Sequence, residues 1–423
     1  MDEFFRKIKI IWGDTALRSR ILFVVIILLV FRLLAALPIP GVDPVGLQAF
    51  LSNNEFFGLF SVFSGGGLTN LSIMMLGVGP YITASIIMQL GTIIFPRVKE
   101  MYHEEGETGR RKVAMYSRVI SVPLAIIQSF SFIALLQSQG IITALSPITL
   151  VTNIAIITAG SVLLMWIGEL ISEFGVGNGV SFIIFAGIVS SLPGAATQLF
   201  AVYDPAQLPT YIGLLIATLA VVFGIVFVNE AERPIPIAYA KQNKGSASYG
   251  GVSTYIPLRV AQAGVIPIIF AISILLLPQM IVNFLINVAN PTVQTVVAAV
   301  NTFLATQWLY ALVYFVLVFA FTYFYTAITF DPDQMAENLQ KGGAFIPGVR
   351  PGEATAVYVS NIMTRLTLIG ALFLGIVAVL PLLLRMASGI ASLSIGGTAL
   401  LIVVSVVIDL VKKVDAQAAM REY

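Results

Sequence analysis

Ten long apolar runs constrain this chain more than any other feature of its sequence. A helix needs about 20 apolar residues to cross the hydrocarbon core of a bilayer. Hydrophobic residues make up 58% of the 423-residue chain and charged residues 10%, whereas soluble domains carry about 25% charged residues. The pattern predicts an all-α polytopic membrane protein with ten transmembrane helices, at about 21–37, 71–95, 118–138, 149–171, 180–200, 209–229, 262–288, 304–328, 366–384 and 394–411.

The basic residues predict the orientation, because Lys and Arg collect on the cytoplasmic side of membrane proteins. With ten alternating helices, 21 of the 23 basic residues fall on one side, and only Arg32 and Arg385 lie elsewhere. We therefore expect both termini to be cytoplasmic. The segments on that side are the N-terminal segment, the loops 96–118, 230–261 and 329–365, and the C-terminal tail.

A short internal repeat indicates two related halves. The second run contains "GVGPYITASI" at 77–86 and the seventh contains "GVIPIIFAIS" at 264–273. Each run is the second in a block of five, and two five-helix blocks in one chain have inverted topology, which places a functional pathway between them. Gly and Pro are common in membrane helices, so chance similarity is the alternative.

The ionisable residues argue against catalysis within the membrane. Cysteine is absent, the single histidine, His103, lies in "HEEGE", which is not HExxH, and neither GxSxG nor GxxxxGK[ST] occurs. Glu169, Arg385 and Asp409 lie near the ends of runs, where they can reach water. We therefore expect that the protein is not an enzyme and binds no metal or cofactor. If it moves a substrate energetically uphill, the energy must come from a partner or from the membrane potential.

Two further features suit a pore. An apolar constriction closes a pore to ions by dewetting, without charges, and β-branched residues are frequent in the runs. The segment "LFSVFSGGGLTNLS" at 59–72 combines apolar residues with three consecutive glycines, which resist a stable helix. It suits neither lipid nor a solvated linker, although an ordinary loop tip remains the alternative.

Long motifs along the chain resemble the bacterial SecY family (SecY/Sec61-alpha), the channel-forming subunits of the Sec protein translocon. The resemblance covers essentially the whole chain. It rests on "FRLLAALPIPGVD" (31–43), "FSGGGLTNLSIMMLGVGPYITASIIMQL" (63–90), "EEGETGRRK" (104–112), "GVGNGVSFIIFAGIV" (175–189), "YAKQNKGSASYGGVSTYIPLRV" (239–260), "AGVIPIIFA" (263–271), "FDPDQMAENLQKGGAFIPGVRPGEAT" (330–355) and "GGTALLIVV" (396–404).

The resemblance implies a fold of two inverted, pseudo-symmetric five-helix halves, 1–200 and 201–423, around an hourglass pore. The first half would contain a plug at about 58–69, and the second would contain the cytoplasmic loops 230–261 and 329–365. The implied plug residues are Phe60, Val62, Phe63, Gly65, Gly66, Gly67 and Leu68. The implied pore ring is Val78, Ile82, Val180, Ile184, Ile269 and Ile402.

The same resemblance implies a lateral gate, where the second and seventh runs face each other, flanked by the third and eighth. Its polar residues would be Thr83, Gln89 and Gln262. Partner docking would involve Arg350, Lys241, Lys244 and Arg259.

The implied function is a protein-conducting channel in the bacterial cytoplasmic membrane. It would carry unfolded polypeptides with signal sequences across that membrane and insert membrane proteins sideways into lipid. The implied partners are the small membrane subunits SecE and SecG, the SecA ATPase and the ribosome, with no direct nucleic-acid substrate. Two alternatives stay open: a secondary transporter of a small solute, which ten helices and an inverted repeat would also suit, and an insertase or scaffold without a continuous pore.

Overall fold

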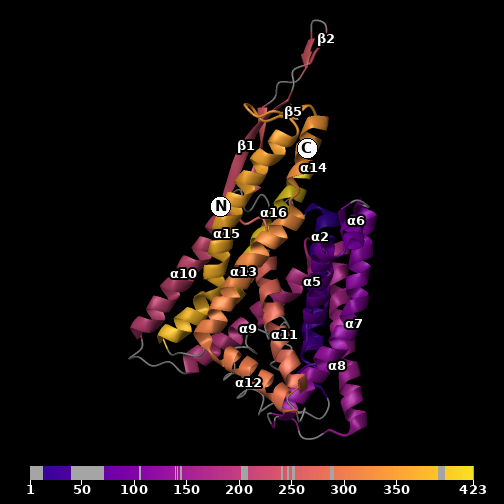
Figure 1. The fold of residues 1–423 in the computed structure, drawn as a ribbon, viewed down its shortest axis with the longest axis vertical. Helices are drawn as coiled ribbons and strands as arrows, with labels where there is room; N and C mark the ends of the chain where they lie inside the picture. Colours follow the sequence, from indigo (N-terminus) through magenta and orange to yellow (C-terminus); the bar gives the residue numbers. More distant parts are fainter. Residues whose placement is uncertain are drawn as a thin grey trace.

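The computed structural model is built from long helices, with a small β-sheet at one end (Figure 1). It describes residues 13–39, 71–103, 106–138, 140, 142, 145–201, 208–239, 242–244, 247–249, 253–285, 290–388 and 396–422.

The helices in these ranges follow the apolar runs. They are α2 (Thr15–Ala35), α5 (Gly79–Ile94), α6 (Pro96–His103), α7 (Gly106–Ser138), α8 (Pro147–Phe174), α9 (Gly179–Ala201), α10 (Leu208–Glu230), α11 (Ile266–Leu285), α12 (Pro291–Ala305), α13 (Gln307–Thr329), α14 (Pro332–Lys341), α15 (Glu353–Ser388) and α16 (Gly396–Glu422). The strands are β1 (Glu232–Tyr239), β2 (Gln242–Lys244), β3 (Ala247–Tyr249), β4 (Ser253–Arg259) and β5 (Ala344–Phe345).

Each of the ten predicted runs overlaps one long helix, namely α2, α5, α7, α8, α9, α10, α11, α13, α15 and α16. By length and apolarity, five helices in the described ranges are able to cross a membrane, or six if α5 and α6, which are bent by 105° at their break, form one broken span. The chain is therefore a mostly helical protein with several membrane-length helices, and the number ten stays a prediction.

The structure corrects the sequence expectation in two respects. The protein is not purely α-helical, because residues of the loops 230–261 and 329–365 form strands. The second and seventh runs also begin outside their helices: α5 starts only at Gly79 and α11 only at Ile266. Before each start a glycine adopts a left-handed backbone, Gly77 with φ 59° and Gly264 with φ 58°, which interrupts helical hydrogen bonding at that point.

Side-chain caps and prolines fix where several helices begin. Ser146 accepts a hydrogen bond from the backbone N–H of Thr149 at 3.2 Å, and Pro147 follows at the first position of α8. Asp331 likewise accepts from the backbone of Asp333 and Gln334 at the start of α14. A cap oxygen satisfies N–H groups that have no partner within the helix, and proline costs nothing there because those positions need no donor.

The helices pack in two groups. Helices α2, α5, α7, α8 and α9 contact one another, and so do α10, α11, α13, α15 and α16. The groups meet where α11 packs against α5 and α7, and where α16 packs against α9. Figure 1 shows α2, α5, α7 and α8 side by side at the right, α10 and α15 at the left, and α11 between them.

The β-sheet joins the two long cytoplasmic loops predicted from the sequence. Strand β1 pairs antiparallel with β4 and also with β5, where Ala238 lies opposite Phe345. An apolar cluster lies beneath the sheet and includes Ile235, Ile237, Leu258 and Ile346, together with Val359 of α15. We call this sheet, with α14 and the first turns of α15, the loop domain.

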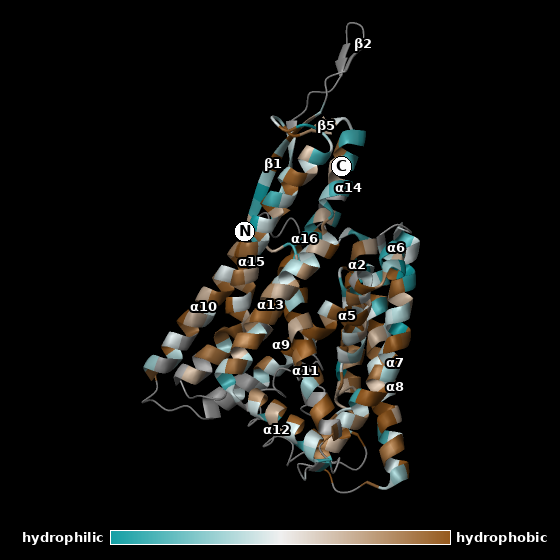
Figure 2. Ribbon diagram, in the orientation of Figure 1, coloured by the Kyte–Doolittle hydropathy of each residue, from teal (hydrophilic) through white to brown (hydrophobic). Residues whose placement is uncertain are grey.

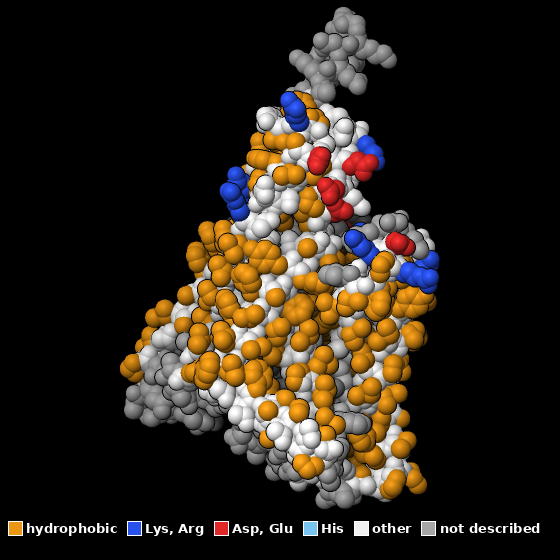
Figure 3. Space-filling model, in the orientation of Figure 1, with side chains coloured by type: hydrophobic (Ala, Val, Ile, Leu, Met, Phe, Trp, Pro, Cys, Tyr) orange, Lys and Arg blue, Asp and Glu red, His pale blue; other side chains and the backbone are white. Residues whose placement is uncertain are grey.

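Polar and apolar residues separate along the long axis. Hydrophilic residues concentrate at the end that carries β1, β5, α14 and α6, and hydrophobic residues dominate the helices below (Figure 2). The charged side chains on the visible face gather at the same end (Figure 3). Large apolar side chains face outward from the helices, for example Phe223 and Phe227 of α10, which are 72% and 66% exposed. Such exposed apolar surface is typical of helices in lipid.

Candidate functional site: the helix junction and the pocket above it

The six residues predicted for the pore ring come from four helices where the two groups meet. Val78 and Ile82 lie at the start of α5, Val180 and Ile184 in the first turns of α9, Ile269 in α11 and Ile402 in α16. Five of them are at most 7% exposed, and Val180 is partly buried. All six lie in or against one apolar cluster. Their closure into a ring stays a prediction.

Helix α8 holds the segment that leads into the ring. Gly160 of α8 approaches residues 71–78 so closely that a Cβ at Gly160 would lie 2.0 Å from the backbone oxygen of Ile73. The next residue, Ser161, is buried and donates a hydrogen bond of 2.9 Å to the backbone oxygen of Gly77. Val78 follows directly, so α8 sets the position of this ring residue.

The second half of the chain repeats this close approach. Gly370 of α15 lies against the segment before α11, where a Cβ would be 2.6 Å from the backbone oxygen of Val260. In each case a glycine of a long helix admits the non-helical segment that precedes the "GVGP" or "GVIP" motif. The two segments therefore resemble each other in backbone conformation and packing as well as in sequence.

Of the residues predicted for the lateral gate, two lie in α5 and the third precedes α11. Thr83 donates to the backbone oxygen of Gly79 at 3.0 Å, and the Gln89 Nε2 donates to Ser85 Oγ at 3.2 Å, both within α5. Gln262 is exposed and lies in a pocket beyond the N-terminal end of α11. Helix α11 does contact both α5 and α7, as the gate requires.

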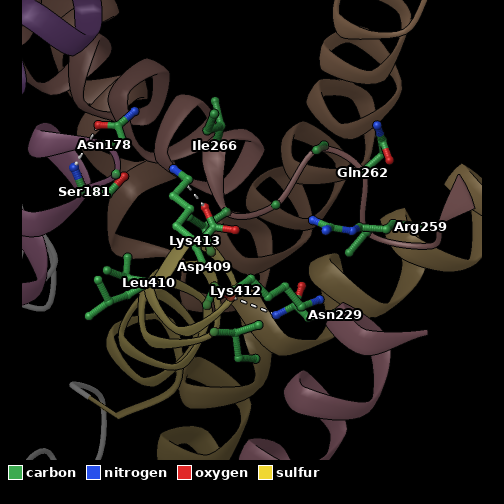
Figure 4. Close-up of a pocket in the computed structure, with 18 of the residues that line it drawn as sticks. Asn178, Ser181, Asn229, Arg259, Gln262, Ile266, Asp409, Leu410, Lys412 and Lys413 are labelled. Atoms are coloured by element: carbon green, nitrogen blue, oxygen red, sulfur yellow. Dashed lines mark hydrogen bonds and ion pairs between the residues drawn. The ribbon is translucent and has the colours of Figure 1, made fainter. Parts of the chain in front are cut away.

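A polar pocket of about 260 Å³ lies beside the ring residues. Figure 4 shows Asn178, which directly precedes α9, and Ser181 of α9 on one side, Arg259 and Gln262 on the other, and Asp409, Lys412 and Lys413 of α16 between them.

Hydrogen bonds and ion pairs tie the lining of the pocket together. Asn229 donates to Ser405 Oγ at 2.9 Å, linking α10 to α16. Lys412 pairs with Glu230 at 2.9 Å, and Lys413 lies 4.0 Å from Asp409.

Sequence reasoning missed most of this pocket. It named Arg259 as a docking residue and Gln262 as a gate residue, and the structure places them in one lining with the polar end of α16. The only signal was that Asn229, Asp409, Lys412 and Lys413 end two apolar runs, the sixth and the tenth. That signal gave no reason to expect the two ends to meet.

Two of the predicted docking residues, Arg259 and Arg350, lie in or near the loop domain. Arg350 is exposed, and its backbone oxygen accepts a hydrogen bond of 2.8 Å from Thr355 Oγ1. Arg259 is exposed at the end of β4. Lys244 belongs to β2, but the structure describes only its backbone, and Lys241 lies outside the described residues. The plug at about 58–69 lies outside them too.

Comparison with known proteins agrees with this arrangement. The SecY family model matches residues 72–411. The protein translocase subunit SecY of Mycobacterium bovis is 40% identical over 430 residues, covering 96% of both chains. The SecY of Synechococcus elongatus is 42% identical over 417 residues, covering 97% of this chain and 94% of the relative.

Solved structures share the fold. A protein-conducting channel superposes with a TM-score of 0.62 at 18% identity, over 94% of this chain and 92% of that one. Sec61 from a canine ribosome-channel complex of the endoplasmic reticulum gives 0.61 at 16%, over the same shares. The family match over most of the length, together with the fold, shows that this chain belongs to the SecY family.

Proposed function

We propose that this chain is the channel-forming subunit of a protein translocase in a bacterial cytoplasmic membrane. It conducts unfolded polypeptides across that membrane and releases membrane segments sideways into lipid. One observation supports this most: buried apolar residues of α5, α9, α11 and α16 come together where the two helix groups meet, and a polar pocket adjoins them. The relatives are named translocase subunits, and they lend no support to a small-solute transporter.

The chemistry of the proposed ring fits this task. Ile and Val are stiff at χ1 because they branch at Cβ, so Ile82, Ile184, Ile269 and Ile402 form a defined apolar surface. Such a surface offers ions no oxygen ligands to replace water, yet it makes no sequence-specific demand on an extended peptide. A signal sequence that displaces α11 from α5 and α7 can then reach lipid. The segment 58–69 is part of this proposal as the plug.

We also propose that the chain has ten spans in two inverted halves, 1–200 and 201–423, with both termini cytoplasmic. The matching left-handed glycines, Gly77 and Gly264, and the paired close approaches of Gly160 and Gly370 support the two halves. The gathering of charged side chains at the end of the loop domain supports the orientation (Figure 3).

The proposed partners are a driving partner at the loop domain, either the SecA ATPase or the ribosome, and the small subunits SecE and SecG. A related Sec61 channel has been solved in a ribosome-channel complex. Arg350 is the proposed contact, because a guanidinium offers five donors in a rigid fork and this one is exposed. The protein itself would supply no catalysis and would need no cofactor.

Crosslinking tests the channel directly, because the chain has no native cysteine. Ile82→Cys and Ile184→Cys should each crosslink to a secretory precursor stalled midway. Leu219→Cys is the matched control, since Leu219 lies on α10 and is 60% exposed on the outer face. Crosslinks from neither ring position, or equal crosslinks from Leu219→Cys, would contradict the channel.

A further inference from the structure

The pocket beside the ring carries an excess of positive charge. Arg259, Lys412 and Lys413 line it, and two carboxylates oppose them: Asp409 in the lining, and Glu230, which pairs with Lys412 from outside the lining. Lys412 and Lys413 keep side-chain exposures of 31% and 45%, so their ammonium groups can reach a ligand. Asn178, Ser181, Asn229 and Gln262 add amide and hydroxyl groups to the same lining. The pocket therefore combines cations with neutral hydrogen-bond donors.

The pocket lies about one helical turn from the predicted ring on three helices. Ser181 precedes Ile184 by three residues in α9, and Ile266 precedes Ile269 by three in α11. In α16 the order is reversed, since Ser405 follows Ile402 by three. Three residues rise about 4.5 Å in an α-helix. A chain that enters the proposed ring from the polar end would therefore come close to the pocket.

We propose that this pocket is a binding site for carboxylates of a polypeptide, which holds acidic segments and repels basic ones just before the constriction. The site would make Lys412 and Lys413 determinants of charge selectivity in transport. The passing polypeptide as ligand rests on the proposed function, whereas the charge preference rests on the lining alone.

The preference for acidic over basic peptides should be modest, because the side chains of Lys412 and Lys413 are partly exposed to solvent. Two unit charges about 6 Å apart interact only weakly at the dielectric constant of water, and salt weakens the interaction further. Because two lysines act together, we expect an acidic peptide to be favoured over a basic one by about 3- to 10-fold at low salt. The preference should shrink as ionic strength rises.

The test uses the full chain in vesicles of uncharged phosphatidylcholine, so that lipid charge does not attract peptides. Ser181→Cys carries a photo-crosslinker in the pocket of this naturally cysteine-free protein. The probes are three unstructured Gly/Ser peptides of equal length that contain Asp, Asn or Lys at the same positions. Crosslinking should fall in the order Asp, Asn, Lys.

Removing the lysines should abolish that order. Lys412→Gln with Lys413→Gln leaves Arg259 against Asp409 and Glu230, so the Asp-to-Lys ratio should fall to one or below. The charge-conserving pair Lys412→Arg and Lys413→Arg should retain the ratio and report that the fold is intact. The matched control is Lys99→Gln with Arg111→Gln, which removes two exposed positive charges away from the pocket and should leave the ratio unchanged.

Three results would overturn the inference. The first two are equal crosslinking of acidic and basic peptides, and an Asp-to-Lys ratio that is unchanged when both lysines are replaced. The third is that millimolar inorganic phosphate, added at constant ionic strength, removes the preference for the acidic peptide, which would indicate a small-anion site. Transport of precursors into the same vesicles, with the driving partner added, is measured separately. Charge-ordered crosslinking without transport would contradict the proposed function and leave the pocket's preference standing.

Discussion

Adding one methyl group at Gly160 should displace the segment that carries Val78. A Cβ at this position would lie 2.0 Å from the Ile73 oxygen, and ordinary contact begins near 3.4 Å. Helix α8 and the segment 71–78 must therefore separate by about 1.4 Å, the difference between these distances. That shift would also strain the 2.9 Å hydrogen bond from Ser161 to Gly77.

The expected effect of Gly160→Ala on the free energy of unfolding combines two destabilising terms and one stabilising term. Overpacking a tight contact costs about 1–3 kcal/mol, and the lost hydrogen bond costs about 1 kcal/mol. Alanine is favoured over glycine in a helix by about 1 kcal/mol, which offsets the second term. The net destabilisation is therefore about 1–3 kcal/mol, which should lower the unfolding temperature in detergent by about 1–3 °C for a chain of this length.

Two variants separate these terms. Gly213→Ala on α10 is the matched control, because nothing lies within 4 Å of its added Cβ, so it should be neutral or stabilising. Ser161→Ala removes the hydrogen bond without the clash and should cost about 1 kcal/mol. Ion conductance in planar bilayers should rise for Gly160→Ala, since Val78 moves. If Gly160→Ala unfolds at or above the temperature of Gly213→Ala, the close contact between Gly160 and the backbone oxygen of Ile73 is contradicted.

Three further predictions follow from the same geometry. Gly264→Ala should cost about 1–2 kcal/mol in thermal unfolding, because φ is 58° although the space around it is open; Gly264→Asn should cost less, and equal costs would contradict the conformational reason. Arg350→Glu should strongly reduce partner-driven transport at an unchanged unfolding temperature, because only the backbone of Arg350 is held, by Thr355; near-normal transport would remove Arg350 from the docking site. Deleting residues 60–67 should raise ion leakage in planar bilayers more than it lowers protein transport, and unchanged conductance would make this segment a linker.

The long helices could be predicted because their cause is local. Backbone N–H and C=O groups in lipid must be satisfied within the segment itself, so an apolar run of sufficient length becomes a helix whatever lies beside it. The starts of α5 and α11 were harder. Both runs are apolar before Gly79 and Ile266, and the left-handed backbone at Gly77 and Gly264 delays the start of each helix.

The loop domain shows a different limit. The sequence marked 230–261 and 329–365 as polar loops on one side, but it gave no sign that β1 would pair with both β4 and β5. Strand pairing depends on which segments meet, and β5 has only two residues. The apolar cluster of the loop domain likewise joins β1 and β4 to α15, which lies far from both strands in the chain.

By itself, the sequence determined a membrane protein with long apolar helices, charges gathered on alternate connections and a repeated Gly-Val-x-Pro motif. Only the tertiary structure decided that α11 packs against α5 and α7, that α16 meets α9, and that Arg259 and Gln262 share a pocket with Lys412 and Lys413. The physical reason is that lipid solvates every apolar helix face about equally well. Hydropathy therefore specifies helices but not their neighbours, which close contacts such as Gly160 against Ile73 select instead.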